Sequence, residues 1–297
     1  MYNFKSIPDL LAVFPNEQTI INYLEKHRWD GKIPTSPFDP NSKVYKCANN
    51  WYKCKNTGKF FNVKTGTAFA NTKLKLRDWF LASYLFTSHK KGISSCQLAK
   101  DLNITQKSAY YLLDDLRSNL KQSNFIKDML KGVIEIDETY VGGKNKNRHW
   151  NKKVPNSQGR SGKDKISVIV MMERGGNAIT QKVPNVKQET LEPIIRTNVK
   201  KASTVNTDEW LAYKNLGKWY KHQIVNHRKK QYANGEAYVN TAESFNACLK
   251  GTIKNTYHWI SKEKSQRYID EITFRYNTRK YSEQKRFDLV LSSVLSS

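Results

Sequence analysis

The second half of the chain carries a fixed order of apolar runs and amphipathic stretches, which limits the folds open to it more than any other feature. Strand-like runs occupy residues 132–136, 165–172, 178–183, 203–207 and 223–225. Apolar residues recur at helical spacing over 188–200, 242–254 and 261–280, and a short helix is expected near Leu211. The order is therefore three strands, a helix, a strand, a helix, a strand and further helices.

That order is the one found in a ribonuclease H-like α/β fold, and three acidic residues occupy corresponding places in it. Asp137 lies on the first strand, Asp208 follows the fourth, and Glu243 opens the helix after the fifth. Lys250 follows Glu243 by seven residues, on the same helical face. Carboxylates are suitable ligands for Mg²⁺ or Mn²⁺, and two such ions can activate an attacking oxygen and stabilise a leaving one. The sequence predicts a two-metal phosphoryl-transfer site at Asp137, Asp208 and Glu243.

Neighbouring acidic residues are secondary candidates. Glu138 and Glu209 adjoin two of the predicted ligands and should point to the opposite side of an extended strand, so we expect them behind the site or on the surface. Glu135 shares the face of Asp137 and is a weaker alternative ligand.

The charge of the chain predicts a polyanionic partner. It has 51 Lys and Arg against 26 Asp and Glu, a formal net charge of +25, and a pI of about 9.8. Nucleic acid fits this excess, and an anionic membrane surface is the competing partner. We expect no membrane association, because no apolar run approaches the roughly 20 residues of a spanning helix and the amino terminus lacks a signal-peptide pattern. Four cysteines give no disulfide framework, so an intracellular location is expected.

Two basic segments lie close in sequence to the predicted site. The first, residues 144–165, holds eight Lys or Arg and is either a solvated hairpin loop or a phosphate-binding loop. We predict DNA contacts at Lys146, Arg148, Lys152, Lys153 and Arg160, and in the second segment at Arg228, Lys229 and Lys230.

A helix-turn-helix is predicted between residues 94 and 120. Ser94 and Thr105 are good N-cap residues, and a three-residue turn separates the two helices. In a basic chain the second helix would enter the major groove of DNA, although an ordinary pair of antiparallel helices gives the same pattern. The predicted DNA contacts at the start of this helix are Gln106, Lys107, Ser108 and Tyr110.

The segment between Gly31 and Gly66 is turn-rich and alternates like a small hairpin around residues 52–63. Zinc ribbons have this appearance, but they need four ligands, usually as two close cysteine pairs. Here Cys47 and Cys54 have six residues between them and no second pair follows. We therefore predict a module without zinc, which is either a ribbon that has lost its metal or a segment that never was a ribbon.

Several motifs resemble those of DDE-type transposases of bacterial insertion sequences, in the ISXO-like superfamily related to eukaryotic Merlin elements. In the predicted catalytic region the matching stretches are Ile136–Gly143, Val205–Tyr213, Val239–Phe245, Leu249–Gly251, Tyr257–His258 and Arg275–Arg279. Ahead of it, Lys64–Phe69 and Ser88–Ser94 also match, so the resemblance spans roughly residues 5–282.

The resemblance implies a zinc ribbon and a helix-turn-helix ahead of a ribonuclease H-like core. It also implies Mg²⁺-dependent cleavage at inverted-repeat ends and joining of the 3′-OH to target DNA. Carried onto this sequence, the metal ligands are Asp137, Asp208 and Glu243, and Lys250 contacts DNA phosphate near the reacting strand. Asn240 is a DNA contact and, like Asn246, a fallback for the third catalytic position. The departure is the ribbon, where Ser36-Pro37-Phe38-Asp39 stands in place of the first cysteine pair.

Two histidines lack a metal-ligand partner at useful spacing. His258 is expected to be structural or a DNA contact, and His149 is given no role.

Together these features predict an α+β, multi-domain protein. The expected domains are 1–72 (a helical segment and degenerate ribbon), 73–125 (helix-turn-helix) and 126–297 (catalytic). The predicted function is a DNA transposase using two Mg²⁺ or Mn²⁺ ions, acting on double-stranded DNA as a homodimer or higher oligomer in the bacterial cytoplasm, associated with the nucleoid. The alternatives are a nuclease or resolvase of the same fold, and a transposase-derived DNA-binding protein without catalysis.

Overall fold

The structure is a computed structural model that describes residues 4–70, 72–126, 128–143, 145–155, 157, 162–225 and 238–295. The chain forms two compact units, one of residues 1–120 with 281–297 and the other of residues 121–280. Among the described residues, no helix combines the length and apolar character needed to cross a membrane.

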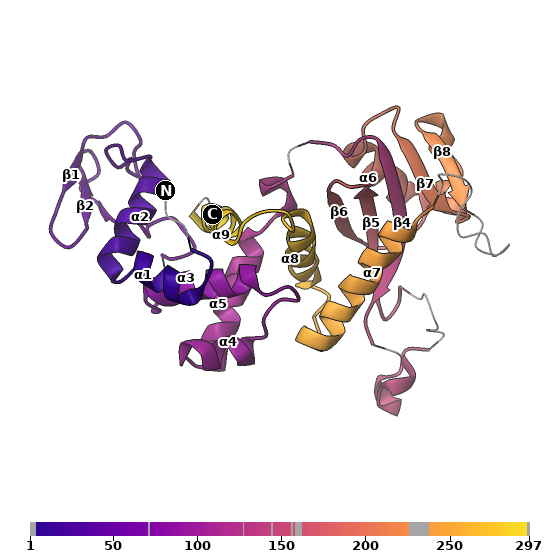
Figure 1. Cartoon of the computed structure of the whole chain (residues 1–297), viewed down its shortest axis with the longest axis horizontal. Helices are drawn as coiled ribbons and strands as arrows, with labels where there is room; N and C mark the ends of the chain where they lie inside the picture. Colours follow the sequence, from indigo (N-terminus) through magenta and orange to yellow (C-terminus); the bar gives the residue numbers. More distant parts are fainter. Residues whose placement is uncertain are drawn as a thin grey trace. The chain divides into compact units, whose positions relative to one another are not determined.

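The first unit combines helices with a small antiparallel sheet (Figure 1). The sheet has the order β1-β2-β3, and β2 pairs with both neighbours. Its helices are α1 (Ile7–Val13), α2 (Glu17–Trp29), α3 (Leu76–Ser88), α4 (Ser95–Leu102), α5 (Gln106–Asn119) and α9 (Glu283–Leu295), and its strands are β1 (Val44–Lys46), β2 (Tyr52–Cys54) and β3 (Phe60–Phe61). The helices between residues 94 and 120 and the hairpin around residues 52–63 fall where the sequence predicts them, β1 adds a third strand, and α9 lies beyond the last predicted helix.

Side-chain caps set the beginnings of most of these helices. Ser94 Oγ accepts a hydrogen bond from the Gln97 amide at the start of α4, and Thr105 Oγ1 accepts one from Ser108 at the start of α5. Between the two helices Asn103 takes the left-handed conformation that ends α4, with φ of 52°. The predicted N-caps and turn are therefore confirmed.

The carboxyl-terminal helix α9 belongs to the first unit, whereas the sequence places residues 126–297 in one domain. Its apolar stripe includes Phe287, whose ring packs edge-on against Phe4 at 5.2 Å and Phe80 at 5.4 Å between centroids. Tyr84 Oη also donates to Glu283 at 2.9 Å. Burial of this stripe accounts for the division, since an isolated amphipathic helix must cover its apolar face. The predicted boundary between residues 72 and 73 likewise falls inside one compact unit.

The second unit is built on a five-stranded sheet in the order β6-β5-β4-β7-β8. β4 pairs antiparallel with β5 and β5 antiparallel with β6, whereas β7 runs parallel to both β4 and β8. The strands are β4 (Val133–Val141), β5 (Ile166–Glu173), β6 (Ala178–Val183), β7 (Thr204–Asp208) and β8 (Lys221–Val225). The element order along the chain agrees with the prediction.

Helices cover both faces of this sheet (Figure 1). One core is formed with α6 (Gln188–Asn198) and includes Ile134, Ile136 and Val205, and the other is formed with α7 (Asn240–Thr252) and α8 (Ser265–Asn277) and includes Val168 and Val170. A π-helical turn, Ile253–Tyr257, continues α7. Short 3₁₀ turns lie at Gln122–Asn124, Asn145–Asn147, Trp150–Lys152, Leu211–Tyr213 and Leu216–Lys218. The central strands β4 and β5 are therefore buried on both sides, and polar groups on them need a specific reason.

Candidate active site

Two neighbouring parallel strands bring Asp137 and Asp208 together. β4 and β7 pair with Glu135 opposite Asn206, and each aspartate lies two residues farther along its own strand. Residues two apart on a strand point to the same face, so the two aspartates extend from adjacent positions. One carboxylate oxygen from each of Asp137, Glu138 and Asp208 lies within 4.8 Å of the others. This carboxylate cluster is the only such His, Cys, Asp and Glu group in the described residues.

Glu138 corrects a prediction, because it faces the cluster and not the opposite side of the strand. Its side chain is half-buried beside Asp137 and Asp208. Alternation of successive residues on an extended strand is what predicts the opposite side for Glu138. The pairing of β4 with β7 ends at Glu135, and the Glu138 carboxylate nevertheless reaches the cluster, with one oxygen within 4.8 Å of Asp137 and Asp208.

The environment of Asp137 favours its protonated form. Burial, together with the nearby charges of Asp208 and Glu243, raises the pKa of Asp137 to about 6. Two donors oppose this shift: the Glu138 amide at 2.8 Å from Oδ1 and Asn246 Nδ2 at 2.7 Å from Oδ2. Asn246 is buried on α7, so this bond ties the helix to the strand.

Glu138 shows the same effect more strongly. Burial, together with the charges of Asp208 and Asp137, raises its pKa to about 7. The adjacent Tyr213 is fully buried, and burial followed by the Glu138 charge raises the Tyr213 pKa well above its ordinary value. Asp208 Oδ1 accepts a hydrogen bond from the Trp210 amide at 3.0 Å. Like charges held this close, without a cationic side chain in the cluster, resemble a site whose counter-charge is a metal ion.

Glu243 lies in the first turn of α7, and its side chain is exposed. Its charge contributes to the raised pKa of Asp137, so it lies near the cluster, although its oxygens are outside the 4.8 Å group. Lys250 is exposed two turns later on the same helix. The structure therefore brings Asp137 and Asp208 together and places Glu243 at their margin.

The alternative candidates for the third metal ligand differ in their burial and in their partners. Glu135 is fully buried and paired with Arg174 at 2.8 Å, which makes it unsuitable as a ligand. Asn240 is exposed at the start of α7, whereas Asn246 contacts Asp137 directly. Glu209 is half-buried beside Asp208 but is not in the carboxylate cluster.

The donor set of the cluster fits Mg²⁺ or Mn²⁺. Its ligand atoms are carboxylate oxygens, which these hard cations prefer. Asn246 Oδ1 is buried and has no hydrogen-bond partner among the described residues, and Glu138 Oε1 is buried with only the Tyr213 hydroxyl as a donor beside it. Buried oxygens without donors are costly unless a cation or water satisfies them, so a divalent ion suits this place.

The predicted DNA-contact residues at the start of α5 lie at an accessible helix end. Gln106 and Lys107 are exposed, and Ser108 and Tyr110 are half-buried. Gln106 Nε2 donates to Ser95 Oγ at 2.8 Å, and no acidic residue occurs in the first turn of α5.

The structure describes part of the basic segment after β4. Asn145 closes its base through hydrogen bonds with both backbone groups of Val154. Lys146, Lys152 and Lys153 are exposed, while Arg148 donates to the Asp164 carbonyl at 3.2 Å.

The remaining predicted contacts divide between exposed and undescribed residues. His258 is exposed with φ of 59°, with Nδ1 3.1 Å from the Lys254 carbonyl. His149 is also exposed. Arg160, Arg228, Lys229 and Lys230 lie outside the described residues.

The ribbon-like module does not provide a zinc site. Cys54 is buried, and its neighbours are the hydroxyls of Ser36, Ser42 and Thr57. Cys47 Sγ lies 3.8 Å from the Tyr45 carbonyl and belongs to no metal-ligand group in the described chain. Zinc needs four thiolate, imidazole or carboxylate ligands, so one thiol among hydroxyls does not fit it.

Three features of this site were not predicted. Asn246 was predicted only as a fallback for the third catalytic position, although its spacing of three residues from Glu243 places it on the same helical face, where it could have been predicted as a direct partner of Asp137. The approach of Glu138 to the cluster and the buried Tyr213 beside it have no sequence signal, because both depend on contacts between residues that are distant along the chain.

Comparison with known proteins assigns the family. The ISXO2-like transposase domain matches residues 129–277, half of the chain. An uncharacterised protein in transposable element ISH50 of Halobacterium salinarum is 24% identical over 298 residues, covering 96% of this chain and 99% of its own length. An uncharacterised transposase-like protein of Haemophilus influenzae is 33% identical over 103 residues, covering 34% of this chain and 82% of its own length.

Two solved structures also show similarity. The Mos1 strand transfer complex gives a TM-score of 0.30 at 12% identity, covering 68% of this chain and 73% of that chain. A pre-cleavage Mos1 transpososome gives a TM-score of 0.26 at 11% identity, covering 95% of this chain and 98% of that chain. These scores are too low to support a conclusion about the fold. The domain match and the full-length relative are sufficient, and the chain belongs to the ISXO2-like family of insertion-sequence transposases.

Proposed function

We propose that the chain cleaves DNA at the terminal inverted repeats of its element and joins the resulting 3′-OH ends to target DNA. The observation that carries this proposal is the convergence of Asp137 and Asp208 from adjacent parallel strands, with like charges that a divalent cation would neutralise. The sheet order and strand directions support a ribonuclease H-like catalytic core.

The proposed roles follow from the positions of the side chains. Asp137 and Asp208 hold the ions, and Glu243 completes the coordination from the start of α7. When bound, two Mg²⁺ or Mn²⁺ ions activate the attacking oxygen and stabilise the leaving one. Asn246 orients the Asp137 carboxylate through its 2.7 Å hydrogen bond. Lys250, exposed two turns along α7, contacts phosphate of the reacting strand.

DNA binding is assigned to surfaces on both units. The start of α5 enters the major groove, with Gln106, Lys107, Ser108 and Tyr110 at the DNA. Lys146, Arg148, Lys152, Lys153 and Arg160, with Arg228, Lys229, Lys230, Asn240 and His258, contact phosphates near the catalytic residues. The net charge of +25 supports such contacts, since phosphate neutralisation drives non-specific affinity. A homodimer or larger assembly on DNA follows from the need to process two element ends, in the bacterial cytoplasm at the nucleoid.

The test uses a labelled duplex carrying the inverted repeat that flanks the coding sequence, with Mg²⁺ and the full chain. We expect nicking at the repeat end and joined products, both lost in Asp208→Asn. Nicking without joined products indicates a nuclease of the same fold. Sequence-specific binding without cleavage in either Mg²⁺ or Mn²⁺ indicates a DNA-binding protein derived from a transposase.

A further inference from the structure

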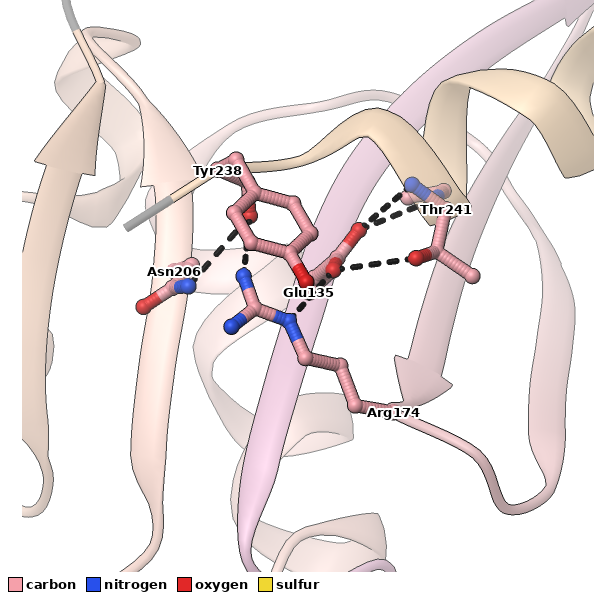
Figure 2. A network of polar contacts seen from close by, with 6 residues as sticks. Glu135, Arg174, Asn206, Tyr238 and Thr241 are labelled. Carbon is pink, nitrogen blue, oxygen red and sulfur yellow. Dashed lines mark hydrogen bonds and ion pairs between the residues drawn. The ribbon is translucent and has the colours of Figure 1, made fainter. Parts of the chain in front are cut away.

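A network of polar contacts joins β4, β7 and the start of α7, the elements that carry the proposed metal ligands, and Figure 2 shows it from close by. Arg174 Nε donates to Glu135 Oε1 at 2.8 Å, and another Arg174 nitrogen donates to the Tyr238 carbonyl at 3.1 Å. The guanidinium also lies over the Tyr238 ring, 3.4 Å from its centroid. Asn206 Nδ2 donates to the same Tyr238 carbonyl at 3.3 Å. We call Glu135, Arg174, Asn206, Tyr238 and Thr241 the anchor network.

The anchor network ends at the first turn of α7. The amides of Thr241 and Ala242 donate to Glu135 Oε2 at 2.8 Å and 3.1 Å, and Thr241 Oγ1 is 3.1 Å from Oε1. A carboxylate that accepts the first amides of a helix satisfies donors that have no partner within the helix, and it complements the positive end of the helix dipole. Glu135 therefore fixes the position at which α7 starts.

The spacing relates the network to the catalytic residues. Glu135 is two residues before Asp137 on β4, Asn206 is two before Asp208 on β7, and Thr241 is two before Glu243 on α7. Glu135 and Asn206 are also direct cross-strand neighbours. The anchor network thus joins β4, β7 and α7, the three elements that carry the proposed ligands. Its residues lie two positions before the ligand on each element.

Burial makes this layer rigid. The Glu135 side chain is completely inaccessible to solvent, and Asn206 is equally buried. An uncompensated buried carboxylate is strongly destabilising, so Glu135 has to keep both Arg174 and the α7 amides as partners. Movement of the helix start would break these bonds together.

We propose that the anchor network positions Glu243 against Asp137 and Asp208, with Glu135 and Arg174 acting as positioning residues for the metal site. This inference rests on the proposed function, because it assigns Glu243 to the metal. Partners behind metal ligands typically change metal affinity by about 10- to 100-fold when they are removed.

The test measures Mn²⁺ affinity of the full chain by electron paramagnetic resonance, together with its melting temperature. Thr241→Val removes the hydroxyl donor without changing the size of the side chain, Thr241→Ser restores it, and Arg174→Lys breaks the geometry of the guanidinium. We expect Mn²⁺ affinity to fall about 10-fold or more in Thr241→Val and Arg174→Lys and to be near native in Thr241→Ser.

Arg275→Lys is the matched control. Arg275 forms a comparable buried ion pair with Glu271 at 2.6 Å on α8, outside the carboxylate cluster. Arg275→Lys should lower the melting temperature of the chain without changing its affinity for Mn²⁺. In a Glu243→Gln background, Thr241→Val should have no further effect on affinity, because the network acts through Glu243.

The outcomes separate the two proposals. If the native chain binds no Mn²⁺, the proposed function fails. If the native chain binds Mn²⁺, and folded Thr241→Val and Arg174→Lys bind it equally well, the anchor network is only structural and the inference is overturned. The inference is also overturned if Thr241→Val lowers Mn²⁺ affinity equally in the native chain and in the Glu243→Gln background.

A separate inference concerns the sheet β1-β2-β3, where the family resemblance implies zinc. Ser36 Oγ accepts hydrogen bonds from the amides of Phe38 and Asp39, at 3.2 Å and 3.4 Å, and Ser42 Oγ accepts one from Asn56 at 3.0 Å. Ser36 and Ser42 are buried around Cys54. Hydroxyls thus occupy the interior where a ribbon would place thiolates, and their oxygens are already bound to backbone donors.

We infer that this module folds around a metal-free centre of one thiol and three hydroxyls. The full chain, purified without chelator, should contain no stoichiometric zinc by elemental analysis, and its melting temperature should not change with 1,10-phenanthroline. Ser42→Ala should lower that temperature, whereas Ser83→Ala should not, because the buried Ser83 hydroxyl has no partner among the described residues. One zinc per chain, or destabilisation by the chelator, would overturn the inference. Equal effects of the two serine variants would contradict the role of the hydroxyls.

Discussion

Glu135 and Asp137 lie two residues apart on one strand and on the same face, yet their surroundings are opposite. Glu135 is fully buried with an arginine, two helix amides and a hydroxyl as partners. Asp137 has two donors, Asn246 and the Glu138 amide, but faces the carboxylates of Asp208 and Glu138. The first carboxylate is neutralised within the protein, whereas the second is part of an excess of negative charge.

This difference distinguishes a structural carboxylate from a functional one. A buried charge that is fully paired contributes order, and its loss leaves the partner uncompensated. A group of like charges is unfavourable in the absence of its ligand and is tolerated where a ligand supplies the opposite charge. Burial alone would identify Glu135 as the functional carboxylate. The uncompensated negative charge around Asp137 identifies Asp137 instead.

The largest expected effect is the loss of catalysis in Asp137→Asn. Metal-ion stabilisation of the transition state is worth several kcal/mol, so removal of a ligand should reduce the rate of strand cleavage about 1,000-fold or more. The melting temperature without metal should stay the same or rise, because one like charge is removed. Cleavage kinetics and calorimetry check this, and a strong loss of stability would place Asp137 in the same class as Glu135.

Glu135→Gln should show the opposite pattern. Breaking a buried ion pair by removing one partner typically costs about 3–5 kcal/mol in the free energy of unfolding. The double variant Glu135→Gln with Arg174→Met should regain part of that loss, since no unpaired guanidinium remains. Urea unfolding measures both. If Glu135→Gln lowers the free energy of unfolding by less than about 1 kcal/mol, Glu135 does not have the structural role that distinguishes it from Asp137.

The third prediction concerns pH. The folded-state pKa values of Asp137 and Glu138, about 6 and about 7, exceed their ordinary values, so the folded state binds more protons than the unfolded state between pH 4 and 7. The stability contributed by these protons is lost as the pH rises through 6 and 7. The melting temperature without metal should therefore fall over this window, more in the native chain than in Asp137→Asn.

Excess Mg²⁺ should offset that loss most strongly near pH 8, where the carboxylates are charged and protons no longer compete for them. Thermal melting at several pH values, with and without Mg²⁺, gives the comparison. Stabilisation by Mg²⁺ that does not change with pH would show that these carboxylates do not bind it.

The smallest effect is expected for Asn246→Ala. Loss of the 2.7 Å hydrogen bond removes a donor to the charged form, so the pKa of Asp137 should rise further. Metal affinity at pH 6 should fall about 10-fold, in the range typical of groups that orient a ligand. Titration calorimetry at pH 6 and pH 8 checks this, and the difference from the native chain should narrow at pH 8. Ser244→Ala, at an exposed position on the same helix, is the matched control.

Much of the secondary structure follows from the local pattern. Period-2 and apolar runs predicted all five strands of the second unit, and cap residues such as Ser94 and Thr105 predicted where helices begin. These signals are local, because strand periodicity and helix caps depend on residues within a few positions of one another. The place of α9 was not predictable in this way, since its stripe around Phe287 could have covered either unit.

For the site, the sequence by itself determined that Asp137, Asp208 and Glu243 occupy the first strand, the end of the fourth and the start of the helix after the fifth, and the structure then placed the first and fourth strands side by side. The sequence did not determine which neighbouring acids join them. The tertiary structure brought the Glu138 carboxylate beside Asp137 and Asp208, and it enclosed Glu135 with Arg174 and the start of α7. Charge balance depends on groups that are distant in sequence, here 39 residues to Arg174 and 106 to Thr241, and only the folded chain brings them together.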